Sequence, residues 1–508
     1  DPRTSDGDDD NGRFSKDYND ITNMTWSNIL TYQTKIKKKH NLDLLAGYEI
    51  NSKESDGLGT TISNFARWDK PEVNNGVVYQ SMGGSNSTTR IVSYITRANY
   101  DYDNKYYLGA SWRTDGSSRL ARENRWGNFW SLSGAWRVSS ESFMKPLQNW
   151  LSDLKLRVSY GVNGTLPSSY YGYMGLSSLT SNYNDNPGIT QSQLENKELT
   201  WETNYNFNSG IDLGFFDNRL NVTFEYYVRT TKNLLYSRPL SLATGFSSYL
   251  ANIGKLQNKG YELEIRSTNI ETKDFRWSTS LNLGHNANKI LKLDGDLKQV
   301  TSGTSIHKVG LPYSTYYMIE FAGIDPVDGE PMFYKNTTDE NGNLNKETTK
   351  DPRSAEKVIL QCADPTITGG LGNSISYKWF DLNFNVNFSF GAWNYDGAAG
   401  KLEHGGDGTL NIPIYYRKRW QKEGDETSIE RFVVGRSISM TDYATTRRLY
   451  SGDYVRLKNL TFGFTLPKTW TRKVGIDNIR LYASGNNLLT WAAYDYIDPE
   501  SGSSPSWD

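Results

Sequence analysis

Strict alternation of apolar and polar residues is the clearest pattern in the chain. The segment Asp381–Phe390 reads DLNFNVNFSF, with an apolar side chain at every even position and a polar one at every odd position. Successive side chains of a strand point to opposite faces, so this pattern predicts a strand with one apolar and one polar face. A helix would scatter the aromatic residues around its circumference. The segment is also long enough to cross a bilayer, which takes about 9–11 tilted residues.

The same alternation recurs along the chain and predicts about 14 strands, joined by links that are alternately short and long. The expected strands are Trp26–Ile36, Leu42–Ile50, Val92–Tyr102, Lys105–Arg113, Phe129–Val138, Leu154–Val162, Glu202–Leu213, Arg219–Val228, Gly260–Thr268, Phe275–Leu283, Ile367–Tyr377, Asp381–Phe390, Tyr454–Leu466 and Ile479–Leu488. The longest links are Asn51–Arg90, Asn163–Leu199, Arg229–Asn258, Asn286–Pro365 and Gly391–Gly452. Short turns at one end and long loops at the other are typical of outer-membrane β-barrels, and a β-sandwich or propeller would not show this bias.

Composition agrees with a barrel and excludes several other classes. The 508 residues carry a net charge of -1, and they include 34 Tyr and 15 Trp, which suit aromatic girdles at membrane interfaces. The sequence contains no run of about 18 apolar residues, so no transmembrane helix is expected. Cys362 is the only cysteine and the four histidines lie far apart, so neither a disulfide framework nor a zinc site is expected. The balanced charge gives no reason to expect nucleic acid as a partner.

The strand count predicts an open part of a barrel. An even number of strands that starts and ends in long loops cannot close by itself, and an open edge in lipid would leave backbone groups unpaired. We therefore expect the remaining strands to come from parts of the same protein outside this chain. Asp1–Tyr18 and Ala492–Asp508 are expected to be external loops, and Asp1 is expected to be an internal residue of the mature protein.

Three segments have sequence motifs that are more specific than the alternation of apolar and polar residues. The first contains WRTDGSSRL at Trp112–Leu120, followed by RWGNFWSLSGAWRVSSESFM. The second, Leu199–Leu235, begins LTWETNYNFNSGIDLGFFDNRLNV and is followed by NIGKLQNKGYELEI at Asn252–Ile265. The third reads YVRLKNLTFGFTLP at Tyr454–Pro467 and continues into IRLYASGNNLLTW and YDYIDPE. In this order they closely resemble the SusC/RagA family of TonB-dependent outer-membrane transporters.

The resemblance implies an all-β protein, a transmembrane antiparallel β-barrel. Residues 1–508 would be the C-terminal part of a 22-stranded barrel, with the plug and first strands absent from this chain. It further implies TonB-driven import of oligosaccharides or peptides across the bacterial outer membrane. The implied partners are outer-membrane lipid, a SusD-like surface lipoprotein, and TonB through the absent N-terminal region. It implies no enzyme activity and no cofactor. A passive porin or a non-transporting surface adhesin barrel is the alternative, and an upstream plug and TonB box would decide between them.

The pattern also makes local predictions. Asp103-Asn104 is expected to form a two-residue hairpin turn. In Gly260–Arg266, Glu262 and Glu264 should face the lumen, where charge is ordinary background and gives little support to a glycosidase. Between Leu457 and Leu460 the apolar positions change phase, so we expect a β-bulge near Lys458-Asn459 to keep one apolar face.

Aromatic and arginine side chains in the long loops are the candidate substrate-binding residues, because aromatic faces stack on sugar rings and arginine fixes carboxylates. The candidates are Trp68, Trp393, Tyr395, Tyr415, Tyr416, Arg417 and Arg419. Simple packing within the loops is the alternative. The run Asp339–Asn343 resembles a calcium loop, but Leu344 stands where an EF-hand needs glycine, so a polar turn is the better interpretation. No catalytic or metal-binding residue is expected.

Overall fold

Long antiparallel strands dominate the computed structural model, which describes residues 11–67, 69–184, 186–293, 295, 297–339, 342–406, 411–434, 443–494 and 497–501. Within these residues fourteen strands form one sheet in the order β1-β2-β3-β4-β5-β6-β9-β10-β13-β14-β22-β23-β26-β27. Their bounds are β1 Arg13–Ile36, β2 His40–Phe65, β3 Gly76–Tyr102, β4 Tyr106–Ser117, β5 Trp126–Arg137, β6 Leu151–Thr165, β9 Glu202–Phe215, β10 Leu220–Lys232, β13 Lys255–Glu271, β14 Phe275–Lys292, β22 Ile367–Tyr377, β23 Phe380–Phe390, β26 Tyr454–Thr465 and β27 Arg480–Ala492.

Short elements occupy the links between these strands. The first long links hold β7 Leu176–Tyr183, β8 Asn186–Gln193, β11 Leu235–Pro239, η3 Leu242–Thr244 and β12 Ser248–Asn252. Residues 293–366 hold β15 Gln299–Ser302, β16 Ser305–Lys308, β17 Thr315–Ile319, β18 Phe321–Ile324, β19 Pro331–Tyr334, β20 Thr348–Thr349, η4 Pro352–Ser354 and β21 Lys357–Cys362. Residues 391–453 hold β24 Trp393–Tyr395, α2 Gly397–Leu402, η5 Ile414–Lys418, η7 Thr446–Arg448 and β25 Leu449–Ser451. The remaining helices are η1 Val138–Ser140, η2 Ser142–Leu147, α3 Lys468–Thr471, η8 Arg472–Val474 and η9 Pro499–Ser501.

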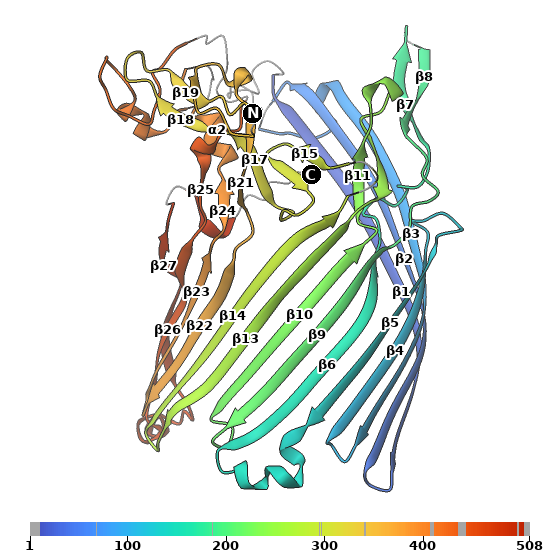
Figure 1. Ribbon diagram of the computed structural model, residues 1–508, viewed down its shortest axis with the longest axis vertical. Helices are drawn as coiled ribbons and strands as arrows, with labels where there is room; N and C mark the ends of the chain where they lie inside the picture. Colours follow the sequence, from blue (N-terminus) through green and yellow to red (C-terminus); the bar gives the residue numbers. More distant parts are fainter. Residues whose placement is uncertain are drawn as a thin grey trace. The chain divides into compact units, whose positions relative to one another are not determined.

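The chain divides into two compact units, which are described separately. The first comprises Asp1–Ala135, Ser159–Asn206 and Thr231–Ile253. The second comprises Trp136–Val158, Phe207–Thr230 and Gly254–Asp508. In the second unit, β13, β14, β22 and β23 run side by side, and the short strands of residues 293–366 and 391–453 gather beyond one end of them (Figure 1). No helix among the described residues is long and apolar enough to span a membrane.

Most predicted strands are present with bounds that differ by a few residues. β22 has the predicted bounds, and β23 begins one residue earlier than expected. The expected turn is present at Asp103-Asn104, where both residues have a φ of 55° and the Lys105 amide donates to the Tyr102 carbonyl at 2.9 Å. These are the left-handed conformations that a type I′ hairpin turn requires. The link has three residues rather than the expected two, because Tyr102 lies opposite Tyr106.

The first three strands are much longer than the sequence predicts. The expected loop Asp1–Tyr18 is wrong from Arg13 onward, where β1 begins, while residues 1–10 lie outside the described residues. The expected loop Asn51–Arg90 is wrong in large part, because only residues 66–75 separate β2 from β3. The added segments are rich in Ser, Thr, Asn and Gly and pair residue by residue, for example Thr22 opposite Glu54. Where neither face of a sheet meets lipid, the ladder continues without an apolar period, so the alternation that predicts a strand is absent there.

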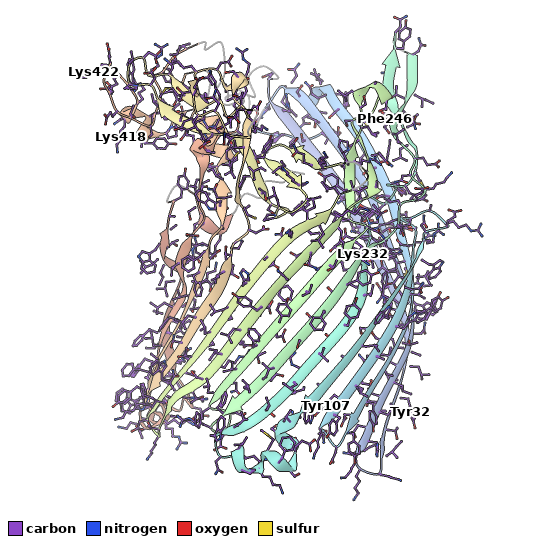
Figure 2. All side chains as sticks on the ribbon, viewed as in Figure 1. Tyr32, Tyr107, Lys232, Phe246, Lys418 and Lys422 are labelled. Carbon is purple, nitrogen blue, oxygen red and sulfur yellow. The ribbon has the colours of Figure 1, made fainter. Side chains whose placement is uncertain are left out.

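Aromatic residues mark the apolar face of the first unit. The ring of Tyr48 lies 6.0 Å from that of Trp26 and 5.2 Å from that of Tyr94, so three neighbouring strands contribute to one aromatic cluster. Tyr32, on the same face, lies near the short-link end of β1 (Figure 2). Aromatic side chains at two levels along the strands are typical of the girdles at the two membrane interfaces.

The turn between β1 and β2 is strained by its residues. Lys37 and Lys38 have φ values of 47° and 60°, which side chains other than Gly, Asn and Asp adopt at a cost. We predict that Lys37→Asn combined with Lys38→Gly stabilises the protein by about 1 kcal/mol, because Asn-Gly is the preferred type I′ pair. Urea unfolding of the full-length protein in lipid vesicles measures this. Asn104→Gly, in a turn that already has favourable residues, is the control and should have a smaller effect.

Candidate functional site

The second unit carries a polar wall, which is one face of β13, β14, β22, β23, β26 and β27. Residues directly opposite each other in an antiparallel pair point to the same face. The register therefore assembles continuous polar rows, which are Glu262–Gly284–Thr368–Ser389–Tyr454, Glu264–Asn282–Gly370–Asn387–Arg456–Thr490 and Arg266–Ser280–Gly372–Asn385–Asn459–Asn486. Apart from Glu262, Glu264, Arg266 and Arg456, the rows consist of hydroxyl, amide and glycine positions, which suit a water-filled lumen.

A β-bulge keeps this wall polar along its whole length. In the pairing of β23 with β26, Asn385 lies opposite Asn459 and Val386 lies opposite Leu457, so Lys458 is the extra residue. The predicted bulge near Lys458-Asn459 is thereby confirmed. Without the extra residue, every side chain after it would point to the other face, because strand side chains alternate with a period of two.

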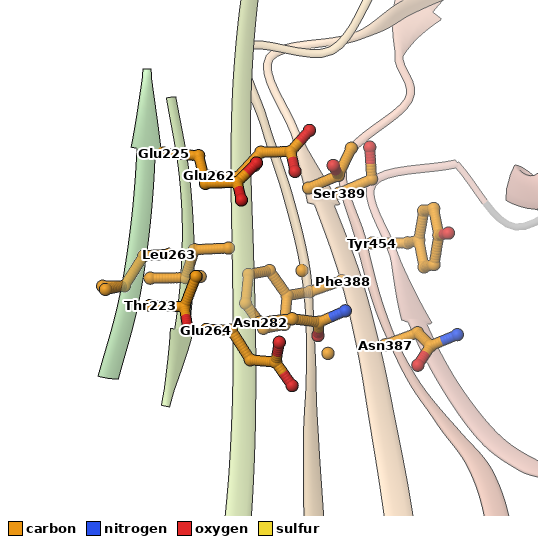
Figure 3. Close-up of a pocket in the computed structure, with 15 residues that line it drawn as sticks. Thr223, Glu225, Glu262, Leu263, Glu264, Asn282, Asn387, Phe388, Ser389 and Tyr454 are labelled. Carbon is orange, nitrogen blue, oxygen red and sulfur yellow. The ribbon is translucent and has the colours of Figure 1, made fainter. Parts of the chain in front are cut away.

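A hollow of about 700 Å³ lies in the wall (Figure 3). Glu225 and Glu262, from β10 and β13, lie on one side of it, and Asn387 and Tyr454, from β23 and β26, lie on the other. Two glycines of the polar face, Gly284 and Gly370, keep side chains out of the middle of the hollow. A Cβ added at Gly370 would come within 2.7 Å of the Asn282 side-chain oxygen, so even alanine would crowd the wall there.

Charges around the hollow are mostly neutralised. Arg157 donates two hydrogen bonds to Asp212, at 2.8 and 2.9 Å, and a third to Glu225 at 2.6 Å. Glu264 pairs with Arg266 at 2.5 Å. Glu262 is exposed and forms no ion pair within the part of the chain that the structure describes. A glycosidase needs one protonated and one ionised carboxyl group across a substrate, and a Glu264 already paired with arginine fits that role poorly.

The wall holds no metal-binding cluster among the residues that the structure describes. The described residues contain no group of three or more His, Cys, Asp or Glu that could hold a metal ion. Burial raises the pKa of the Cys362 thiol, on β21, to about 11, so this sulfur stays protonated and is a poor nucleophile at neutral pH. The arrangement can bind and guide polar solutes through hydrogen bonds.

The predicted binding residues fall into two groups in the structure. Trp393 and Tyr395 lie on β24, which pairs with β25, and both are half-buried. Tyr415 and Tyr416 lie in η5, where Tyr416 is only 1% exposed. Trp68 lies outside the described residues. The buried ring of Tyr416 packs inside its loop, so it could contact a ligand only after the loop rearranges.

The two predicted arginines differ in accessibility. Arg417, in η5, is exposed, while Arg419 is half-buried and donates to the Tyr416 carbonyl at 3.4 Å. Lys418 and Lys422 extend outward from the same loop (Figure 2). Arg417 is therefore the arginine of this pair that is available to a carboxylate without a rearrangement.

Sequence reasoning missed the charges that organise this loop. Glu430 is fully buried; Arg447 donates to it at 2.5 Å and the Tyr416 hydroxyl donates to it at 3.1 Å. The Tyr415 hydroxyl donates to Glu403, which also accepts from Arg448 at 3.2 Å. Burial and the neighbouring glutamates raise the pKa of Tyr415 and Tyr416 above the ordinary range, so both phenols remain donors at physiological pH.

These ion pairs and hydrogen bonds connect residues far apart in sequence, and no sequence motif predicts them. The adjacent pair Arg447-Arg448 just before β25 was the only possible signal. Both side chains are held in the interior of the loop, whereas consecutive arginines usually face solvent. We conclude that residues 391–453 fold around a buried ionic network.

Residues 391–453 are also fastened to residues 293–366. The Trp420 indole donates to the Pro326 carbonyl at 3.0 Å, and Arg431 pairs with Glu330 at 2.6 Å. The amide of Tyr395 donates to the Tyr316 hydroxyl at 3.2 Å. The two long loops therefore form one folded body, here called the loop body.

We predict that Glu430→Gln destabilises residues 391–453 by about 3 kcal/mol, because it leaves the buried Arg447 with Glu403 alone as a counter-charge, at 3.8 Å and already paired with Arg448. Hydrogen exchange of the full-length protein measures this as faster exchange confined to the loop body. The double variant Glu430→Met with Arg447→Met should lose less, since the buried charges that remain, Glu403 and Arg448, are paired with each other. Glu347→Gln, which breaks the exposed pair with Lys335, is the control; equal exchange in Glu430→Gln and wild type would contradict the prediction.

Comparisons with known proteins agree with this architecture. Residues 2–488 match the family model described as TonB dependent receptor-like, beta-barrel. TonB-dependent receptor P3 of Formosa agariphila is 34% identical over 518 residues, covering 96% of this chain and 50% of that protein. TonB-dependent receptor SusC of Bacteroides thetaiotaomicron is 31% identical over 437 residues, covering 81% of this chain and 41% of that protein.

A solved structure extends the likeness to three dimensions. The structure of the RagAB peptide transporter superposes with a TM-score of 0.84 at 29% identity, over 97% of this chain and 54% of that one. This chain spans about half the length of the relatives that it matches. The predicted resemblance and fold class are confirmed: the sheet is part of a transmembrane antiparallel β-barrel of the bacterial outer membrane. The chain belongs to the TonB-dependent receptor-like β-barrel family, whose members are receptors and transporters.

Proposed function

We propose that the protein to which this chain belongs imports oligosaccharides or peptides across the outer membrane, driven by TonB and assisted by a SusD-like surface lipoprotein. The likeness to the RagAB peptide transporter over 97% of the chain is the observation that carries this proposal. The likeness to SusC over 81% of the chain supports it.

The polar wall supports transport of a hydrated solute. Its rows offer Asn, Ser and Thr side chains that can each donate and accept hydrogen bonds. Many weak, similar partners allow a polar chain to move from one to the next, because no single contact is strong enough to hold it. The largely paired charges around the hollow are compatible with a neutral sugar or a peptide backbone.

The proposal requires parts of the protein beyond this chain. In the strand order of the described residues, β1 and β27 each have a single neighbour, so their outer edges carry unpaired backbone groups. Such edges are costly in lipid, so we propose that further strands of the same protein cover them and that a plug fills the lumen. The segment that contacts TonB would lie with the plug, and this chain would be the C-terminal part of the barrel.

Energy dependence separates an importer from a passive porin. We predict that cells producing the full-length protein take up labelled oligosaccharide or peptide, and that a proton uncoupler or loss of TonB reduces this uptake to the level of cells lacking the protein. A passive porin would continue to admit solute, because diffusion needs no energy. Uptake that persists without TonB would therefore contradict the proposal, and binding of the probe without any uptake would favour an adhesin.

The loop body offers a surface for the proposed lipoprotein. Together with Asn163–Leu199, the segments Asn286–Pro365 and Gly391–Gly452 are longer than closure of a barrel needs, and such loops commonly carry function. Ile414 and Val434 are 74% and 80% exposed on the loop body, which is unusual for large aliphatic side chains. Their burial against a partner would contribute about 1.5–3 kcal/mol each.

We predict that Ile414→Asp with Val434→Asp lowers severalfold the amount of lipoprotein that co-purifies with the full-length protein, while the barrel still assembles. The new carboxylates would have to lose water at the interface. Leu242→Asp is a matched control, since Leu242 is 79% exposed but lies in a different loop. Co-purification equal to wild type in the double variant would exclude this docking surface.

A further inference from the structure

The segment after β27 returns to the polar wall. Residues 493–501, here called the strap, follow Ala492; 495 and 496 lie outside the described residues. The Ala493 amide still donates to the Asp453 carbonyl at 3.0 Å, which continues the pairing with the start of β26. The strap then contacts both the loop body and the wall, so it joins two parts of the second unit that the chain otherwise connects through β14, β22, β23 and β26.

One end of the strap is held on the wall by ion pairs. Arg456 donates to Asp498 at 2.7 Å and lies 2.9 Å from Glu500, and Lys458 donates to Glu500 at 2.6 Å. Arg456 also donates to Thr490 at 3.0 Å on the neighbouring strand, which fixes the guanidinium in the wall. The Asp498 carboxylate accepts from the Glu500 amide at 2.9 Å, so the two anions form one compact turn.

The other end of the strap is held in the loop body. The ring of Tyr494 stacks on Tyr450 at 3.6 Å, and its hydroxyl donates to Asp396 at 3.3 Å. Asp396 is buried and accepts from the Ala399 amide at the start of α2. A displacement of β24, β25 or α2 would therefore pull directly on Tyr494.

The two attachments differ in kind. Tyr494 is held by an aromatic stack and a buried acceptor, which water and salt affect little. The wall attachment depends on carboxylates, and the Asp498 side chain is 57% exposed. Ion pairs that water reaches are screened by salt and exchange partners readily. Arg456 itself is only 5% exposed, because the strap covers it.

The wall attachment lies beside the hollow. Tyr454 lines the hollow two residues before Arg456, and Asn387, directly opposite Arg456, lines it as well. Removal of the strap would open Arg456 and Lys458 at this margin, with Asn387 next to them. Two cations beside hydrogen-bonding amides form a site for a carboxylate.

We propose that the strap is a releasable link between the loop body and the wall, whose Asp498 and Glu500 occupy a carboxylate site that a passing ligand takes over when the strap leaves. The idea of a passing ligand rests on the proposed import function. The attachment of the strap to the wall does not, so it can be tested independently. A peptide C-terminus and a uronic acid carry the same group, and either could compete with the two side chains.

Hydrogen exchange of the full-length protein tests the attachment. In Asp498→Asn with Glu500→Gln, exchange in peptides that span 493–501 should accelerate on the order of tenfold, while β26 and β27 keep their protection. Glu347→Gln with Asp351→Asn is the matched control, because it removes two carboxylates paired with Lys335 and Arg353 elsewhere in the loop body. Unchanged exchange in the strap would overturn the proposal.

A reversible cross-link tests release during transport. In a Cys362→Ser background, Lys458→Cys and Glu500→Cys are joined by a short bifunctional thiosulfonate, and uptake is measured before and after reduction. Uptake should fall when the strap is locked and recover with reductant. If the peptide C-terminus is the competing group, uptake of an amidated peptide should be less sensitive to the cross-link than uptake of a peptide with a free carboxylate. Full uptake through the locked protein would overturn release. Absence of uptake in the unlocked protein would instead count against the import function, and the exchange experiment would still decide whether the strap is releasable.

Discussion

A bilayer offers no hydrogen-bond partner to the protein backbone, and this constraint accounts for most of the structure. Every amide and carbonyl at membrane depth must find its partner on a neighbouring strand. The strands therefore pair continuously, and each has to show an apolar face to lipid and a polar face to water. The bulge at Lys458 is the clearest sign of this requirement, because one extra residue restores the two faces where the sequence changes phase.

The same constraint decides how much of the fold could be predicted from the sequence. Where lipid covers one face, alternation is enforced, and strands such as β22 and β23 were found almost to the residue. Where both faces meet water, hydrogen bonding alone supports the strand, and any polar residue is acceptable. The extensions of β1, β2 and β3 are of this second kind, so no period in the sequence revealed them.

The candidate site was predictable in part for a similar reason. The polar face and the lumen position of Glu262 and Glu264 follow from alternation and register. The loop body does not follow from any local pattern, because its organising contacts join residues such as Glu430 and Arg447 across an irregular loop. Aromatic residues chosen as ligand contacts, Tyr416 among them, are partly used to satisfy those buried charges.

The ionic network of the loop body has a consequence for how these loops can diverge among relatives. A substitution at Arg447 removes the counter-charge that Glu430 has in this pair, and one at Glu430 leaves Arg447 to share Glu403 with Arg448, so we expect these positions to change together. Exposed positions such as Ile414 and Val434 carry no such restriction. The buried network can thus stay the same while exposed residues change. Related barrels could then bind different surface partners with loops that keep the same fold.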